Sequence, residues 1–351
     1  MTSPRRLTIA LLIATPGTTW GGMEKHTADL AKALADRGHS VHVIGHKTYR
    51  DRFPAGVQFH PLPVQLGRRN LWLQLALRRR LRELSPDIVH AQGNKAAQLV
   101  AKTGKLTRVR VGTVHGTKSS HKAFDRLDEV IAVSPRILAS LRHPRKHLIY
   151  NGVEPRDQRM TTVAGPKLPS GVTNVIAVGR LETVKGFDAL IRAWAMLGST
   201  ADHCHLTIFG EGSQQSHLEQ LIRQLKLENS ITLAGFRENL APIYEEAQLT
   251  VISSEREGLP YVLAESLLGG CPVVSTPVSG PRDILPETAL SAGYRDRDLA
   301  DLMAQALADL EALKRSQQPA IAFAREKLTI TAMAEQTEAL YLRAMGERRA
   351  N

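Results

Sequence analysis

Two short stretches in the second half of the chain combine acidic and basic residues in a way that suits a phosphorylated ligand. The first runs from Ser253 to Glu265 and places Glu257 and Glu265 on either side of Pro260. Proline is favoured in a first helical turn, so a helix is predicted to begin here, and the free amides of such a turn attract anions. Nearby carboxylates can accept hydrogen bonds from the hydroxyls of a sugar or a ribose. The alternative is a capping acid followed by a solvent-exposed helix glutamate.

The second stretch, residues 178–186, contains Arg180 and Lys185. Both cations could hold a diphosphate, arginine through its planar fork and lysine as a point charge. A basic surface loop is the alternative interpretation. Both stretches follow predicted strands of one parallel sheet, and open α/β sheets bind ligands outside the carboxyl ends of their strands. Their shared position therefore favours a binding site.

A glycine-rich stretch also follows the first predicted strand. Residues 15–24 include Gly21 and Gly22, directly before a predicted helix. Consecutive glycines allow the backbone to approach a phosphate or a sugar closely. Because many α/β proteins have such a loop, this stretch alone does not identify a site.

The elements that position these stretches alternate along the whole chain. Apolar runs rich in valine and isoleucine predict strands at residues 8–14, 41–45, 57–62, 87–91, 109–114, 129–133, 147–150, 174–179, 205–210, 230–235, 249–253 and 272–276. Amphipathic patterns predict helices at residues 23–36, 71–84, 187–197, 217–225, 260–268 and 299–313. Strands that are apolar on both faces belong to parallel sheets covered by helices on each side, so the sequence predicts a doubly wound α/β fold.

Residues 151–170 are rich in glycine and proline with little apolar periodicity, which predicts a linker. We therefore expect one Rossmann-like domain over residues 1–155, a second over 156–328 and a helical tail over 329–351. The short apolar run at residues 7–14 is expected to be a buried strand and not a signal peptide, because a glycine-rich turn follows it. No apolar run reaches the ~18 residues of a membrane span.

The charge is divided unevenly between the two halves. Residues 1–160 hold 28 Lys and Arg against 11 Asp and Glu, a net charge of +17, whereas residues 161–351 hold 18 against 23. The first half is therefore expected to meet something anionic, and nucleic acid, a phosphorylated acceptor and an acidic membrane all fit. Residues 68–82 combine six arginines with Trp72, so this helix could lie on an anionic leaflet. A core-facing helix with solvated arginines is the alternative.

Two patterns look like metal sites, but each has a simpler explanation. Asp296 to Asp298 directly precede a predicted helix, so we expect them to cap it. Residues 203–205 read His-Cys-His, but alternation along a strand would send these neighbours to opposite faces. We expect no metal. Cys204 and Cys271 suggest no disulfide framework, which fits a reducing, cytoplasmic compartment.

Taken in order, the motifs resemble those of the retaining glycosyltransferases of family 4, over residues 7–345. The matching pieces are Gly21-Gly22-x-Glu24, Leu30-Ala31-x-x-Leu34, Arg37-Gly38-His39-x-Val41, Pro86-Asp87-Ile88-Val89-His90, Tyr150-Asn151-Gly152-Val153, Gly179-Arg180…Lys185-Gly186 and Glu257-x7-Glu265. This resemblance implies a glycosyltransferase-B fold: two Rossmann-like domains facing a cleft, with a C-terminal helix crossing back to the first. The chain departs from the family pattern at Ser279-Gly280-Pro281, where paired glycines are common, and at Glu154, where aspartate is commoner. The first departure puts the donor contacts of that loop in doubt.

The resemblance also assigns roles to residues. Arg180 and Lys185 would hold the diphosphate, Glu265 the ribose and Glu257 the hydroxyls of the donor sugar. In the first domain, the Gly22 amide would meet the phosphate or sugar, and His115 would face the reacting sugar. The expected catalytic residues are His115, Glu257, Arg180 and Lys185, and the expected donor-binding residues are Gly22, Arg180, Lys185, Glu257, Leu259, Val262 and Glu265.

The expected function is metal-independent, retaining transfer of a hexose-type sugar from a nucleotide diphosphate, with uridine diphosphate favoured. The basic first domain is expected to bind an anionic or lipid-linked glycan, such as a lipopolysaccharide core, at the cytoplasmic face of the inner membrane. No cofactor is expected beyond the donor substrate. A nucleotide-sugar epimerase or hydrolase of the same fold stays open. A basic nucleic-acid-binding protein is the other alternative, but it would leave the two glutamates beside a phosphate site unexplained.

Overall fold

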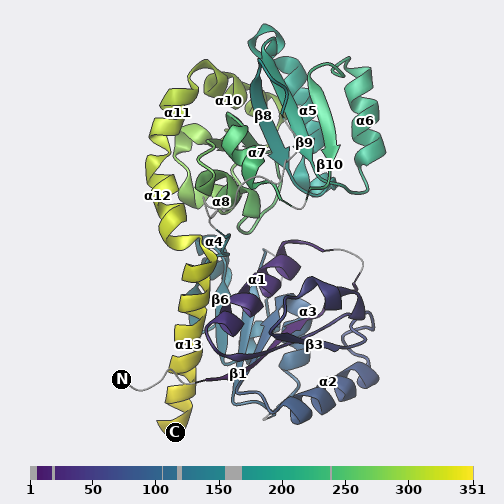
Figure 1. Cartoon of the computed structure of the whole chain (residues 1–351), viewed down its shortest axis with the longest axis vertical. Helices are drawn as coiled ribbons and strands as arrows, with labels where there is room; N and C mark the ends of the chain where they lie inside the picture. The colour runs from purple at the N-terminus through teal and green to yellow at the C-terminus, as the bar shows by residue number, and fades with distance from the viewer. Residues whose placement is uncertain are drawn as a thin grey trace. The chain divides into compact units, whose positions relative to one another are not determined.

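The computed structural model describes residues 6–17, 20–104, 106–116, 121–154, 168–237 and 239–350, without the side chains of residues 348–350. The chain divides into two compact units, unit 1 (residues 1–152 and 328–351) and unit 2 (residues 153–327). Each unit contains one parallel sheet with helices packed on it (Figure 1). Most of the predicted linker, residues 155–167, lies outside the described residues.

The sheet of unit 1 has seven parallel strands in the order β3-β2-β1-β4-β5-β6-β7. They are β1 (Thr8–Ile13), β2 (Ser40–Gly45), β3 (Val57–Pro61), β4 (Ile88–Gln92), β5 (Val109–Val114), β6 (Glu129–Ala132) and β7 (Lys146–Leu148). The helices of this unit are α1 (Gly22–Asp36), α2 (Leu71–Leu84), α3 (Gly93–Val100), α4 (Pro135–Ser140) and α13 (Ile330–Ala350). The strand order reverses between β1 and β4, which makes this the switch point of the sheet.

The sheet of unit 2 has five parallel strands in the order β10-β9-β8-β11-β12. They are β8 (Thr173–Val178), β9 (Cys204–Phe209), β10 (Ile231–Gly235), β11 (Leu249–Ile252) and β12 (Val273–Ser275). The helices are α5 (Phe187–Met196), α6 (Gln215–Gln224), α7 (Ala241–Glu246), α8 (Tyr261–Leu268), α9 (Pro281–Ile284), α10 (Asp296–Ala308), α11 (Leu310–Ser316) and α12 (Gln318–Lys327). Here the order reverses between β8 and β11.

Short 3₁₀ turns occur between several of these elements, at Lys47–Arg52, Phe124–Arg126, Thr183–Lys185, Gly198–Ala201 and Glu287–Ala289. No helix in the described part of the chain has the length and apolar character needed to cross a bilayer.

The predicted fold class is confirmed, and a strand occurs at every predicted strand position. Ile9, Leu11 and Ile13 of the first strand are completely buried, as expected for the centre of a sheet covered on both faces. The prediction of one helix over residues 299–313 was wrong. The helix ends at Ala308, and Asp309 caps the next one by accepting the Ala312 amide at 2.8 Å.

The last helix, α13, belongs to unit 1 and packs against α1 and β5. Its Met333, Leu340 and Tyr341 are buried in the same core cluster as β1. Glu338 on the same helix accepts hydrogen bonds from Arg37, at 2.6 Å, and from His39 Nε2, at 2.8 Å. Burial alone would raise the pKa of Glu338, but the hydrogen bonds from these two residues outweigh it and lower the pKa.

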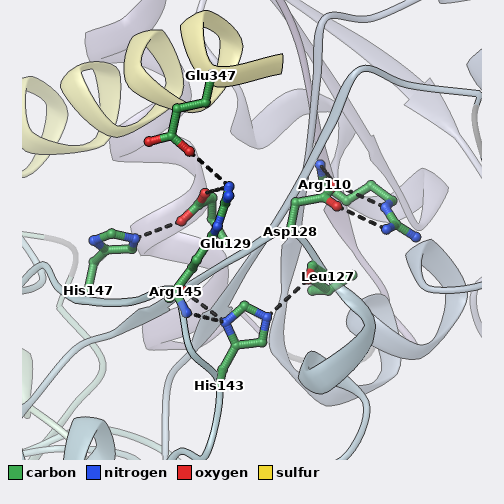
Figure 2. Close-up of polar contacts among 8 residues, drawn as sticks. All are labelled: Arg110, Leu127, Asp128, Glu129, His143, Arg145, His147 and Glu347. Carbon is green, nitrogen blue, oxygen red and sulfur yellow. Dashed lines mark hydrogen bonds and ion pairs between the residues drawn. The ribbon is translucent and has the colours of Figure 1, made fainter. Parts of the chain in front are cut away.

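A polar cluster at the amino ends of β6 and β7 also holds α13 (Figure 2). Glu129 is buried and pairs with Arg145 at 3.2 Å and with His147 at 2.7 Å. Arg145 reaches on to Glu347 of α13 at 3.0 Å. The cluster lies at the amino ends of the strands, whereas ligands of such sheets bind at the carboxyl ends, so its role is to fix the helix.

Candidate active site

In unit 2, the loops that follow β8 and β11 meet because the two strands are neighbours in the sheet. The first loop carries Lys185 and the second carries Glu257. The ammonium nitrogen of Lys185 lies 2.5 Å from Oε1 of Glu257, and the two side chains are only 20% and 14% exposed. The fold therefore places a cation and a carboxylate, 72 positions apart in the sequence, at the switch point of the sheet.

Backbone contacts fix these two loops against each other. The Glu255 amide donates to the Val184 carbonyl at 3.0 Å, and the Ser253 hydroxyl donates to the Lys185 carbonyl at 2.8 Å. Gly186 has a φ of +64°, and a Cβ there would lie 2.2 Å from the Ser253 carbonyl oxygen. Only glycine permits this approach, so Gly186 is required for the two loops to meet.

Glu257 is oriented by two donors that share one of its oxygens. The Ser254 hydroxyl donates to Oε1 at 2.9 Å, and Lys185 contacts the same atom. Among the described residues, Oε2 of Glu257 has no hydrogen-bond partner. This oxygen is therefore available to accept hydrogen bonds from a ligand.

A shallow hollow, open to solvent, lies beside this pair. The residues that line it are Val178, Lys185, Phe187, Val251, Ile252, Ser253, Ser254, Glu257, Pro260 and Val262. Of the predicted donor-binding residues, Lys185, Glu257 and Val262 are thus brought together at one hollow. Leu259 is buried, and its side chain packs close to Gly280.

Arg180 and Glu265 lie in different surroundings. Arg180 is exposed and does not line the hollow. It adds to the lowering of the pKa of Glu182, which is caused mainly by hydrogen bonds from Ser213. Glu265 accepts a hydrogen bond from the buried Tyr244 hydroxyl at 3.0 Å. Burial, followed by the charge of Glu265, raises the pKa of Tyr244 well above its ordinary value, so Tyr244 remains a donor.

In unit 1, the glycine-rich stretch leads into the start of α1. Gly22 is the exposed first residue of the helix, and Gly21 is its cap. The buried carboxylate of Glu24 accepts the Gly21 amide at 3.0 Å and the Thr15 hydroxyl at 2.7 Å. Glu24 therefore holds the loop, as in a capping box, while Tyr49 bonds the same Thr15 hydroxyl at 3.0 Å.

His115 follows β5 and is held by Gln92 at the end of β4, with His115 Nε2 2.7 Å from Gln92 Oε1. The ring of His26 packs edge-on against it, with the centroids 4.7 Å apart. Burial, followed by the nearby histidines His26 and His90, lowers the pKa of His115 well below 6.5. The ring is therefore neutral at neutral pH, and because Nε2 donates to Gln92, Nδ1 is an acceptor.

The sequence did not predict the roles of Gln92, Tyr244 and Ser254. Gln92 is almost completely buried, and no motif marks it except that it ends a predicted strand. Tyr244 contacts Glu265 only because α7 packs on α8. Ser254 lies inside the stretch that carries Glu257, so a polar residue three positions before the glutamate was the available signal.

The two metal-like patterns have other roles. Helix α10 begins at Asp296, so both aspartates lie in its first turn, whereas the sequence had suggested that they precede it. Asp298 accepts the amide of the cap residue Arg295 at 3.2 Å, and Asp296 pairs with Arg192 at 2.6 Å. His205 bonds the Thr232 hydroxyl at 2.9 Å. Nowhere in the described ranges do three or more His, Cys, Asp or Glu residues gather as metal ligands.

Two family models match the chain in succession. The model described as Glycosyltransferase Family 4 matches residues 20–157, in unit 1 and the start of the linker. The model described as Glycosyl transferases group 1 matches residues 161–322, within unit 2. The two matches span most of the chain and include Gly21, Gly22, His115, Lys185 and Glu257.

Known proteins agree with these matches. The lipopolysaccharide core biosynthesis glycosyltransferase LpsE of Rhizobium meliloti is 28% identical over 75% of this chain and 77% of its own. LpsD of the same organism, which has the same description, is 24% identical over 75% of this chain and 77% of its own. The crystal structure of Anabaena HepE with UDP and glucose superposes with a TM-score of 0.79 at 20% identity, over 96% of this chain and all of that one. The chain therefore belongs to the glycosyltransferases of the family 4 and group 1 type, with the glycosyltransferase-B fold.

Proposed function

We propose that the protein transfers a hexose-type sugar from a uridine diphosphate sugar to a lipid-linked or cell-surface glycan of the lipopolysaccharide-core kind. The transfer would retain the anomeric configuration and need no metal. The pairing of Lys185 with Glu257 at the switch point of unit 2 is the observation that carries the proposal. The names of LpsE and LpsD support the acceptor class, and the UDP and glucose bound to HepE support the donor.

Loss of the nucleoside diphosphate is the difficult step, because negative charge develops on the departing phosphate. Lys185, with the amides that begin α5 and α8, would stabilise this charge, and Arg180 would add to it from the same loop. One such group contributes ~3 kcal/mol, or on the order of 10²–10³ in rate. The charge that a metal would otherwise supply would thus come from the protein.

Glu257 would select the sugar. Ser254 and Lys185 both contact Oε1, which holds the carboxylate in one orientation and would leave Oε2 to accept from a ligand. We propose that Oε2 accepts hydrogen bonds from two hydroxyls of the donor sugar. In unit 1, the neutral His115 would accept a substrate hydroxyl through Nδ1.

Retention follows if the acceptor hydroxyl attacks the anomeric carbon from the face that the diphosphate leaves. The glycosidic bond forms as the bond from the anomeric carbon to the phosphate oxygen breaks, and the leaving phosphate takes the acceptor proton. No side chain is then required as a general base. This scheme depends on a diphosphate held close to the reacting carbon, which is the task assigned to Lys185.

A thermal-shift panel of UDP, GDP, ADP and their sugars tests the donor site. UDP and its sugars are expected to raise the melting temperature of the wild type. Lys185→Ala is expected to abolish the shift and Arg180→Ala to reduce it, whereas Lys327→Ala, a surface lysine of the same unit, should leave it unchanged. No shift with any nucleotide, or an equal shift in Lys185→Ala, would contradict the proposal.

The reaction itself is tested by adding a lipopolysaccharide-core acceptor to the donor. The expected product is an α-linked glycan from an α-linked donor, formed in the presence of a metal chelator. Turnover of the donor without an acceptor would indicate a hydrolase or epimerase instead.

A further inference from the structure

Helix α2 buries one apolar face and exposes a second. Leu73, Leu77 and Leu81 are buried. Leu71, Trp72 and Leu75 are 72%, 78% and 57% exposed. These three are neighbours on the first turn and a half of the helix, because residues three and four apart share a face. An amphipathic helix on a protein surface normally places charged groups there.

The surroundings of these apolar side chains are basic. Residues 68–84 contain six arginines and one acidic residue. Arg68 and Arg69 are exposed directly before the helix, and Asn70 fixes its start by accepting the Leu73 amide at 3.1 Å. At the other end, Arg79 and Arg80 share the single carboxylate Glu83, and Arg82 is exposed. The helix therefore has a net positive charge beside its exposed apolar side chains.

Some arginines elsewhere in unit 1 are paired with carboxylates. Figure 2 shows Arg110 in a two-pronged pair with Asp128, at 3.0 and 3.1 Å, and Arg145 between Glu129 and Glu347. Arg110 and Arg145 thus have carboxylate partners, whereas the six arginines of residues 68–82 have the single carboxylate partner Glu83 among the described residues. The positive charge of α2 is available to an external anionic partner.

We propose that α2 docks on an anionic lipid leaflet, with Leu71, Trp72 and Leu75 inserted and Arg68, Arg69 and Arg82 over the phosphate headgroups. Leucine and tryptophan suit the boundary between acyl chains and headgroups, where the indole keeps its N–H in contact with water. Each basic residue near such a surface adds ~1 kcal/mol. Nucleic acid would use the arginines but would gain nothing from the exposed leucines. The inference concerns where the enzyme works and does not depend on the donor site.

Co-sedimentation with vesicles tests this docking. The wild type is expected to bind vesicles of phosphatidylcholine with one-third phosphatidylglycerol at low salt, to bind pure phosphatidylcholine at least tenfold more weakly, and to release as salt increases. The double variant Trp72→Ser, Leu75→Ser should lose at least tenfold in binding. Phe236→Ser, which removes an exposed aromatic from unit 2, is the matched control and should bind as the wild type does.

Fluorescence shows whether the side chain enters the bilayer. Trp194 is buried and Trp20 is partly buried, so the exposed Trp72 is the tryptophan expected to respond. Anionic vesicles should shift its emission to the blue, brominated acyl chains should quench it, and Trp72→Phe should remove both effects. Arg68→Ser, Arg69→Ser should weaken binding several-fold, and every variant should keep its thermal shift with UDP if the donor site is as proposed.

Three results would overturn the inference. The first is no binding to anionic vesicles at low salt, and the second is vesicle binding that the Trp72 and Leu75 variant does not weaken. The third is a dimer in gel filtration that this variant converts to a monomer, since a second copy would then cover the patch. A lost UDP shift in the wild type would instead contradict the proposed donor site and leave the membrane result standing.

Discussion

The two units build their strand-end sites from opposite chemistry. In unit 2, the loops after β8 and β11 bring the charged pair Lys185 and Glu257 to the switch point. In unit 1, the carboxyl ends of β4 and β5, next to the switch point between β1 and β4, carry the uncharged pair Gln92 and His115. Unit 1 is nevertheless the more basic half of the sequence. The net charge of a region therefore does not predict the charge of its site, because arginines and lysines collect on the surface.

Burial is what keeps the site of unit 1 neutral. It lowers the pKa of His26 to about 4 and that of His90 to about 3. Both ring nitrogens of His90 are already engaged, with the hydroxyls of Tyr341 at 2.5 Å and Thr113 at 2.6 Å. A neutral imidazole has one donor and one acceptor nitrogen, which matches these partners. Unit 1 thus offers hydrogen bonds where unit 2 offers charge.

If unit 2 acts through the positive charge of Lys185, removing that charge should lower the activity more than any other substitution. Lys185→Met leaves Glu257 without its cation beside the expected diphosphate, so kcat/KM should fall on the order of 10²–10³. Adding Glu257→Gln should restore part of the affinity for UDP, because the repulsive charge is gone. Steady-state kinetics and calorimetric titration with UDP would measure both. Unchanged kcat/KM in Lys185→Met would show that the pair has only a structural role.

If the buried histidines of unit 1 are neutral in the folded protein, its stability should fall in acid. Unfolded His26 takes a proton near pH 6.5, whereas folded His26 does so only near pH 4. Stability is therefore complete above pH 6.5 and is lost as the pH falls to 4, by about 3 kcal/mol for this residue. Denaturant melts from pH 7.5 to 4 should show a shallower decline in His26→Gln. An equal decline in both proteins would mean that His26 does not remain neutral.

The two loops of unit 2 should separate if Gly186 is replaced. Gly186→Ala places a Cβ 2.2 Å from the Ser253 carbonyl and forces a left-handed conformation on alanine. The left-handed backbone alone costs ~1–2 kcal/mol, so we expect about 2 kcal/mol of destabilisation and weaker UDP binding. Gly346→Ala is the control, because nothing lies within 4 Å of its Cβ position and α13 favours alanine. Equal stability of the two variants would contradict the close approach.

The smallest effect is expected from Ser254, whose hydroxyl donates to Glu257. Ser254→Ala removes one of the two donors to Oε1, a loss of ~1 kcal/mol, or about fivefold. The loss should appear in the affinity for the UDP-sugar and not in that for UDP, because Glu257 is assigned to the sugar. Equal losses for the two ligands would place Ser254 at the diphosphate instead. Lys314→Ala, on the surface of α11, should change neither affinity.

The sequence was sufficient to predict the parallel strands and the positions of the loops that follow them. Apolar runs such as residues 174–179 predict buried parallel strands, and the ends of those strands fix where Lys185 and Glu257 must lie. It was not sufficient to predict which side chains from different elements contact each other. Gln92 and His115 are brought together by the pairing of β4 with β5. The periodicity of the sequence locates the strands but does not tell which of them are neighbours.

Helix α2 shows the same limit on a surface. Its sequence has leucines around most of the helix, so the pattern does not tell which face is buried. The structure buries Leu77 and leaves Leu75 exposed, so the core-facing interpretation is confirmed for one face and membrane contact stays a prediction. The helix packs on the core, as the core-facing interpretation requires. It also leaves a basic, apolar face exposed, as contact with an anionic leaflet would require.

The most direct test of the account is a crystal structure of the protein with UDP. The phosphates should lie within ~3 Å of the Lys185 ammonium, outside the carboxyl ends of β8 and β11, with Oε2 of Glu257 open to the position of the sugar. A nucleotide bound away from these two loops, or a Lys185 side chain directed away from the phosphates, would contradict the proposal that the charged pair of unit 2 binds the donor.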